Sequence, residues 1–323
     1  MTEIFLTIFF ISILLFFLGT GIWVAISMIG VSAFGMMLFT SRPVGDAMAT
    51  TIWGTTSSWT LTALPLFVWM GEILFRTKLS ENLFEGLSPW MQKLPGGLIH
   101  VNVVGCALFA AISGSSAATV ATVGKMSIPE LRKRNYPEKI LLGSLAGSGT
   151  LGLLIPPSII LIIYGVTVQE SIAKLFIAGI LPGIMIAILF MFYVIVWSLI
   201  NKKLMPKSFE NFSLFEKIRR SKKLLPVIIL ILAVIGSIYT GIATATEAAS
   251  LGVVGALLLS YLQKSLTIET FKESLLGATK TSCMIAFILA GSSFLSLAMG
   301  FTGLPRNLAI WIEGMELSPY ILI

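Results

Sequence analysis

The sequence predicts an all-α, polytopic membrane protein, and three observations lead to this fold class. The chain has 323 residues, of which 56% are hydrophobic and only 11% are charged. Soluble globular proteins carry about 25% charged residues, so this composition, with a mean hydropathy of +0.95, excludes a soluble enzyme, a nucleic-acid-binding protein and a disordered chain. Long uncharged runs also alternate with clusters of basic residues, which is typical of membrane-spanning helices.

The N-terminal part of the chain predicts three helical elements and one surface helix. Residues 4–41 are uncharged and long enough for two short helices, broken at residues 19–21. Residues 51–71 are expected to form another span, with Pro65 inside it. In residues 78–93, apolar side chains recur at helical spacing among polar ones. That pattern predicts an amphipathic helix along the membrane surface.

The next uncharged run, residues 94–124, is too short for two full crossings. Its middle is the polar sequence 113–116, which predicts a re-entrant helical hairpin with a polar tip at mid-depth. Such backbone is tolerated in a membrane only where it is buried in protein or lines a cavity.

Residues 140–201 contain two charged residues, Glu170 and Lys174, which mark a turn between two crossings. Glycines at 147–149 and prolines at 156–157 interrupt the first crossing, so a broken helix is expected there. Further spans are expected at residues 224–239, 246–262 and 281–300, and a second amphipathic segment at residues 306–315.

The basic residues predict the topology. Eight of the 22 Lys and Arg residues lie between Lys202 and Lys223, and four lie between Arg132 and Lys139. The positive-inside rule places both clusters in the cytoplasm. Counting crossings in both directions then brings every basic cluster to the cytoplasmic side and the N-terminus to the outside.

A pattern of span, amphipathic segment and proline occurs twice, at residues 61–89 and again at residues 285–319. The two copies enter their amphipathic segments from opposite sides of the membrane. Inverted repeats of this kind are typical of secondary transporters, whose substrate site lies where the repeats meet. The first copy is followed by the hairpin. The sequence ends at Ile323, where a second hairpin is expected, so the C-terminal part of the second repeat is expected to be missing.

The hairpin tip, Ser113, Gly114, Ser115 and Ser116, is the first candidate site. Glycine allows the backbone to turn, and the serines can cap the second half-helix. The N-terminus of that half-helix suits a carboxylate, and the end of the first offers carbonyl oxygens to a cation. The alternative is a small-residue surface for helix packing.

The second candidate site consists of Gly149 and Thr150 together with Pro156 and Pro157. Adjacent prolines remove backbone donors and break the helix. The carbonyl oxygens freed in this way suit a hard cation such as sodium. The alternative is an ordinary proline kink.

Glu247 is an acid near the start of a span, and such acids are functional candidates. It stands three residues after Thr244, however, and this spacing favours a structural capping box. The sequence contains no nucleophile elbow, Walker A sequence or zinc-ligand spacing, so no enzymatic activity is predicted.

At these residues the sequence resembles the large membrane (permease) subunit of tripartite ATP-independent periplasmic (TRAP) transporters, in the ion transporter superfamily. The resemblance covers essentially the whole chain and is strongest at residues 107–119 and 148–159, with support from 181–183, 239–241 and 247–249. The family usually has proline where Ala245 stands.

The resemblance implies sodium-coupled uptake of an organic acid anion, such as a C4-dicarboxylate or sialic acid, by an elevator mechanism in the bacterial inner membrane. A periplasmic substrate-binding protein would deliver the substrate to the N-terminal, periplasmic side, and a small membrane subunit would complete the scaffold. Na⁺ would be the coupling ion, with no other cofactor and no nucleic acid. Residues 113–116 would form the first hairpin tip, facing an unwound segment, and the ion would lie near these residues: Ser113, Ser115, Gly149 and Thr150.

The same resemblance divides the chain into four segments. Residues 1–95 would be scaffold spans with an amphipathic arm helix, and 96–170 the first half of the transport domain. Residues 171–280 would be scaffold spans with the basic cytoplasmic loop, and 281–323 the start of the second repeat. Two alternatives stay open: a stand-alone sodium/anion symporter of related fold, and a truncated membrane remnant that does not transport.

Overall fold

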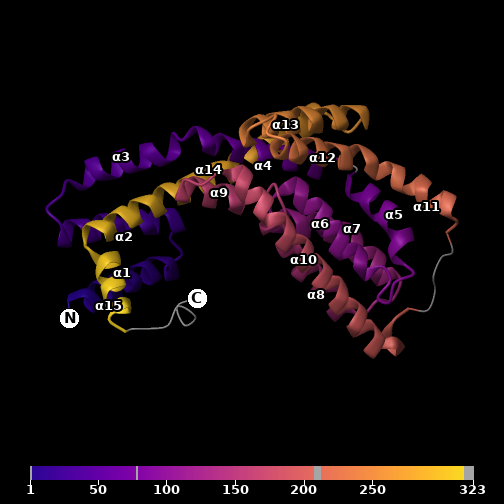
Figure 1. Ribbon diagram of the computed structural model, residues 1–323, viewed down its shortest axis with the longest axis horizontal. Helices are drawn as coiled ribbons and strands as arrows, with labels where there is room; N and C mark the ends of the chain where they lie inside the picture. The colour runs from indigo at the N-terminus through magenta and orange to yellow at the C-terminus, as the bar shows by residue number, and fades with distance from the viewer. Residues whose placement is uncertain (1, 78, 207–211, 316–323) are drawn as a thin grey trace. The chain divides into compact units, whose positions relative to one another are not determined.

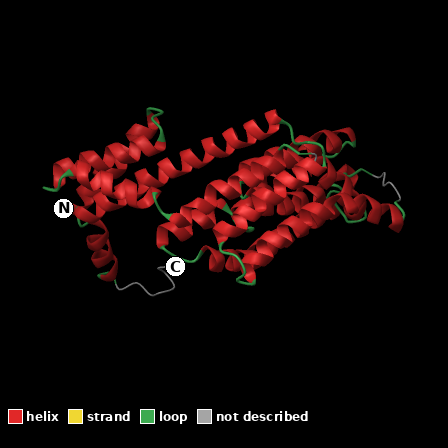
Figure 2. Ribbon diagram, turned by 90° about the horizontal axis from the view of Figure 1, so that it is seen from above, coloured by secondary structure: helices red, strands yellow, loops and turns green. Residues whose placement is uncertain are grey.

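The computed structural model describes residues 2–77, 79–206 and 212–315. Within these ranges the regular secondary structure is helical, as Figure 2 shows, and no strand occurs in them. Among the described residues, four helices are long and apolar enough to cross a membrane, or five spans if the bent pair 44–56 and 59–75 counts as one. The prediction of an all-α polytopic membrane protein is confirmed. The chain forms two compact units, one of Met1–Trp59 with Cys283–Ile323 and one of Thr60–Ser282.

The first unit contains three N-terminal helices and the C-terminal end of the chain. The helices are α1 (Thr2–Gly19), α2 (Val24–Phe39), α3 (Val44–Thr56), the second half of α14 (Ile268–Phe301) and α15 (Leu304–Glu313). Phe10 of α1 packs on Val31 of α2 in a small apolar core. The expected break lies between α1 and α2, where Gly21 has φ +80°. The second amphipathic segment is present as α15, and residues 316–323 of the second repeat copy lie outside the described residues.

The span expected at residues 51–71 is interrupted. Helix α3 ends at Thr56, a 3₁₀ turn η1 covers Trp59–Thr62, and α4 runs from Ala63 to Phe75. The break follows a run of Thr and Ser at 55–58, residue types with low helix propensity. Pro65 falls in the first turn of α4, where its missing N–H leaves no helical bond unmade.

The hairpin region is the centre of the second unit. Its elements are α5 (Leu79–Met91), α6 (Ile99–Ser113), α7 (Ser116–Lys133), α8 (Glu138–Gly149), the 3₁₀ turn η2 (Thr150–Leu153), α9 (Ile159–Val168) and α10 (Ile172–Ile200). Helices α6, α7 and α8 all contact one another, and α10 packs against α6 and α8 (Figure 1). Cys106, Phe109 and Ile112 of α6 are fully buried. Helix α6 is therefore the core of this unit, as a hairpin arm inside a bundle should be.

The amphipathic helix α5 lies against protein. Leu83, Phe84 and Leu87 on its apolar face are buried, and α5 contacts α6, α7 and α11 (Leu214–Ser221). The indole of Trp90 donates to Ser221 Oγ at 2.9 Å. The apolar side chains that recur at helical spacing in α5 therefore pack onto the bundle. The position of α5 along the membrane surface stays a prediction.

Helices α12 (Leu225–Tyr239) and α13 (Ala245–Leu262) form the two spans expected after the basic loop, part of which, residues 207–211, lies outside the described residues. Helix α13 packs along α4, with Gly252 close to Met70. The capping box at the start of α13 is confirmed: Glu247 Oε2 accepts from Thr244 N at 2.8 Å, and Thr244 Oγ1 accepts from Glu247 N.

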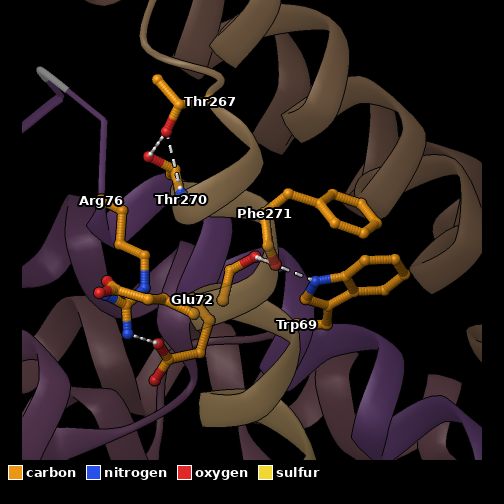
Figure 3. Close-up of polar contacts among 8 residues, drawn as sticks. Trp69, Glu72, Arg76, Thr267, Thr270 and Phe271 are labelled. Atoms are coloured by element: carbon orange, nitrogen blue, oxygen red, sulfur yellow. Dashed lines mark hydrogen bonds and ion pairs between the residues drawn. The ribbon is translucent and has the colours of Figure 1, made fainter.

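Helix α14 begins 13 residues before the span expected at residue 281, and its first turns are held on α4 by polar contacts (Figure 3). The indole N–H of Trp69 points at Ser274 Oγ, 3.3 Å away. Arg76 donates to Glu273 and, at 3.4 Å, to Glu72 of its own helix. Charges such as Lys272 end the apolar run without ending the helix, which is why hydropathy alone places the start too late.

Candidate functional site

The hairpin turns at a left-handed glycine. Helix α6 ends at Ser113, and Gly114 has φ +58°, a conformation that favours glycine. Its N–H donates to Ala110 O at 3.0 Å. Ser115 is extended and caps α7, its Oγ accepting from Ala118 N at 3.4 Å. The turn and cap predicted from the sequence are therefore both present.

Hydroxyl groups gather at this tip. Ser113 Oγ lies 3.0 Å from Thr119 Oγ1, which also donates to Ser115 O at 2.7 Å. Both side chains are buried. The Ser116 hydroxyl oxygen is buried as well, but it has no hydrogen-bond partner. Such groups are rare in native proteins, because an unsatisfied buried polar group costs about 1–3 kcal/mol. The Ser116 hydroxyl is therefore a hydrogen-bonding group of the tip that no protein atom satisfies.

The second candidate segment is a broken helix. Helix α8 ends at Gly149, η2 makes one tight turn, and α9 starts only at Ile159. Ser158, fully buried, donates from Oγ to Leu153 O at 2.6 Å across the break. Pro156 and Pro157 are also buried and have no N–H to continue the helix. The predicted interruption is present.

The structure brings these two segments into contact. Gly152 lies against the tip so closely that a Cβ there would be 2.9 Å from Ser115 C and from Ser116 N. Ile159 N donates to Gly114 O at 3.3 Å. A Cβ on Gly114 would be 2.6 Å from Pro157 O. We call this contact between residues 113–119 and 149–159 the junction; it depends on backbone approaching backbone at glycines.

Two further helices touch the junction through glycines. A Cβ on Gly71 of α4 would be 2.9 Å from Ser113 Cα, and one on Gly179 of α10 would be 2.7 Å from Leu154 O. Neither glycine was a candidate from the sequence. A single sequence carries no signal that separates a glycine in close contact from one that faces open space.

Most of the predicted site residues meet at the junction. Ser113, Gly114, Ser115, Ser116 and Pro157 contact the facing segment or one another, as described above. Gly149 lies against the side chain of Val120 on α7. Pro156 lies near Gly179. Thr150 is exposed, and its Oγ1 donates to Gly147 O at 2.7 Å.

Thr119, Gly152 and Ser158 are junction residues that were not predicted as site residues, although the motifs that predict the site include Thr119 and Gly152. Thr119 could have been found, because a residue three positions after Ser116 in the first turn of α7 faces back toward the tip. Gly152 and Ser158 lie between residues that were candidates. His100 and Glu247 lie elsewhere: His100 Nε2 is 2.8 Å from Pro95 O, at the other end of α6.

The junction offers hydroxyl and carbonyl oxygens as possible ligands. Across the described residues, no group of three or more His, Cys, Asp or Glu side chains is placed to hold a metal ion. Hard cations bind oxygen ligands. The junction thus contains oxygen atoms of the kind that hard cations take as ligands, next to a helix N-terminus of the kind that binds anionic groups.

Comparison with known proteins identifies the family. The DctM component of the tripartite ATP-independent periplasmic transporters matches residues 11–323. The C4-dicarboxylate TRAP transporter large permease protein DctM of Pseudomonas aeruginosa is 32% identical over 292 residues, 90% of this chain and 67% of that protein. The isethionate TRAP transporter permease protein DctMQ of Oleidesulfovibrio alaskensis is 30% identical over 305 residues, 93% of this chain and 47% of that protein.

A third relative takes a different substrate by name. The sialic acid TRAP transporter large permease protein SiaM of Vibrio cholerae is 30% identical over 309 residues, 95% of this chain and 71% of that protein. The chain thus spans about two thirds of the length of the single-component permeases and less than half of DctMQ. On the family match across almost its whole length, the chain belongs to the DctM component family of TRAP transporters, which are membrane transport proteins and not enzymes.

Proposed function

We propose that this chain carries out secondary active uptake of an organic acid anion across the bacterial inner membrane, coupled to sodium entry. Its relatives are named for C4-dicarboxylates, isethionate and sialic acid, which are all organic acid anions. The family assignment supports transport of this substrate class. Which of these anions is carried, and the sodium coupling, are proposals.

The observation that carries the sodium proposal is the unpartnered Ser116 hydroxyl at the junction. Ser116 belongs to the tip that Gly152 contacts, since a Cβ on Gly152 would be 2.9 Å from Ser116 N. A sodium ion near Ser113, Ser115, Gly149 and Thr150 would give Ser116 Oγ a partner. The α7 N-terminus would then attract the substrate carboxylate, and Gly114 with the two prolines would shape the space that it enters.

Electrostatics sets a lower limit on the coupling. Moving one charge through 100 mV is worth about 2.3 kcal/mol, so a dianion that enters a negative interior is opposed by about twice that. Two sodium ions only cancel the two negative charges, and a third makes the step electrogenic and driven. A dicarboxylate would therefore require at least two coupled cations.

The proposal includes partners and a mechanism. A periplasmic substrate-binding protein would deliver the anion, with the N-terminus on the periplasmic side, and a small membrane subunit would complete the scaffold. The small subunit is supported by the relative whose name, DctMQ, joins a second component to DctM. In an elevator mechanism, the junction would move with residues 96–170 against scaffold segments 1–95 and 171–280, with 281–323 as the start of the second repeat.

Sodium binding can be tested on the purified chain in detergent by thermal unfolding in NaCl and in choline chloride at equal ionic strength. The wild-type midpoint is expected to be higher in NaCl. Ser116→Ala should lose most of that difference. Ser237→Ala is the matched control, because Ser237 Oγ donates to Val234 O on α12, away from the junction, and it should keep the difference. An unchanged sodium shift in Ser116→Ala would contradict the placement.

Uptake can be tested in proteoliposomes that contain the chain, with and without a small subunit and a binding protein. Accumulation of labelled dicarboxylate or sialic acid should require an inward sodium gradient. Uptake that persists without the gradient would overturn the coupling. Uptake without the binding protein would favour a stand-alone symporter, and no uptake in any combination would favour a non-transporting remnant.

A further inference from the structure

A separate cavity lies at the base of the hairpin, far from the tip. Helix α6 has 15 residues, which separates its two ends by about 22 Å. The cavity has a volume of about 270 Å³, far above the roughly 10–15 Å³ that one water needs. Its walls are residues 94–97 and Tyr136, two residues of the last turn of α10, Ser198 and Leu199, and three residues after that helix, Lys202, Met205 and Pro206. None of these residues takes part in the junction.

A tight glycine loop shapes one wall. Gly96 has φ +105°, and a Cβ there would be 2.7 Å from Val194 Cγ1 and 2.9 Å from His100 Nε2. The loop therefore lies directly on α10 and on the buried imidazole. Both glycines of the loop, Gly96 and Gly97, have positive φ, a backbone conformation that is strained for residues with a side chain. The shape of this wall therefore depends on the two glycines.

The cavity is amphipathic. Leu94, Leu199 and Met205 supply apolar surface, while Tyr136, Ser198 and Lys202 supply polar groups. Leu98 N donates to Tyr136 Oη at 3.0 Å, which leaves the phenol O–H able to donate. Among the described lining residues there is a lysine and no carboxylate. The set suits a ligand with one anionic group and an apolar part.

Its surroundings favour the protonated phenol. Burial raises the pKa of Tyr136, although a backbone hydrogen bond and the nearby positive charge of Arg134 oppose the rise. The phenol therefore keeps its proton at neutral pH and can act as a donor. Arg134 itself pairs with Glu130 at 3.7 Å.

The position along the chain places the cavity at a membrane surface. Lys202 lies two residues after the end of α10, a 29-residue apolar helix long enough to cross the bilayer. The basic clusters on either side, at 132–139 and 202–223, mark this end as cytoplasmic. Basic pockets between membrane helices on the cytoplasmic side are typical sites for anionic lipid headgroups.

We propose that this cavity binds the phosphate group of an anionic phospholipid of the cytoplasmic leaflet. Lys202 and Tyr136 contact the phosphate, and Leu94, Leu199 and Met205 pack against the glycerol and the first acyl carbons. The lipid ties the base of the hairpin to the end of α10. This site is independent of the junction and of the proposed sodium coupling.

The test is a titration of the delipidated full chain in detergent with short-chain phosphatidylglycerol, read as the shift in unfolding temperature. Wild type should show a saturable rise. Lys202→Gln should raise the half-saturating lipid concentration about fivefold, the effect of one lysine near an anionic surface. Lys203→Gln is the matched control, because it removes the same charge one residue away and does not line the cavity.

Two further arms identify the ligand. Short-chain phosphatidylcholine should give a much smaller shift, because its headgroup has no net charge. Inorganic phosphate at the same concentrations should give none. Equal weakening in the two lysine variants would overturn the site. A saturable shift with inorganic phosphate that matches the lipid shift would overturn the lipid assignment in favour of free phosphate.

Discussion

Two helices of this protein are broken in the middle, and the two breaks differ in their surroundings. The break at residues 57–62 separates α3 from α4, and the break at 150–158 separates α8 from α9. At the first, Trp59 is 78% exposed and Trp53 on the preceding helix 73%. At the second, Pro156, Pro157 and Ser158 are buried and Gly152 touches the hairpin tip.

The difference indicates where each break can lie in a bilayer. Non-helical backbone at membrane depth must be buried in protein or line a cavity, since its polar groups find no water there. Within the break at 150–158, residues 151–152 and 156–158 are buried and meet this condition, so this part of the break can lie at mid-depth. The break at 57–62 lies where the chain passes from one unit to the other, and its Trp59 is exposed. Its exposed tryptophans suit the interface between lipid and water.

The largest expected effect comes from a matched pair of glycine substitutions, one near each break. Gly152→Ala places a methyl group 2.9 Å from backbone atoms of Ser115 and Ser116, which cannot move aside as a side chain could. We expect a loss of about 1–3 kcal/mol in unfolding free energy. Gly54→Ala in α3 meets no atom within 4 Å and should stabilise its helix by about 0.5–1 kcal/mol.

Both variants can be measured by denaturant unfolding of the purified chain in mixed micelles, with helicity as the signal. The sign should differ between the two. If Gly152→Ala is as stable as wild type, the backbone at Gly152 does not pack tightly on the hairpin tip, and the two breaks do not differ in packing.

The parts of this fold that are determined by residues close together in the chain could be predicted from the sequence. Gly114 with its flanking serines predicted the hairpin turn, Pro156 and Pro157 predicted the broken helix, and Thr244 with Glu247 predicted a cap. In each case the residues that decide the structure are neighbours in the chain. Local chemistry is then enough.

The missing parts depend on contacts between distant residues. That the tip faces an unwound segment was implied by the family resemblance alone. The close contacts of the tip with the broken helix at Gly152 and with α4 at Gly71 depend on backbone distances, which a single sequence does not encode. The apolar face of α5 could pack on lipid or on protein with the same periodicity. Helix α14 begins before its hydrophobic run, because Trp69 and Arg76 donate hydrogen bonds to polar side chains in its first turns.

The next effect concerns α4, which follows the exposed break. At its far end Arg76 holds α14 through Glu273 and lies beside Glu72. Arg76→Gln should lower the unfolding free energy by about 1 kcal/mol, a moderate value because Glu273 is half exposed. Added salt should shrink this difference. Lys280→Gln, which removes one charge from an exposed position on α14, serves as control. An equal loss of unfolding free energy in both variants would show that Arg76 contributes only net charge.

The smallest effect is expected at the exposed break itself. Trp59→Phe should change the unfolding free energy by less than about 0.5 kcal/mol, as exposed substitutions do. Trp69→Phe is the same substitution ten residues later, where the indole N–H bonds Ser274 Oγ, and should lose about 1 kcal/mol. In bilayers with brominated lipid, Trp59→Phe should also remove part of the quenched tryptophan emission. If Trp59→Phe destabilises as much as Trp69→Phe and leaves the quenching unchanged, Trp59 is packed against protein, and the two breaks are buried alike.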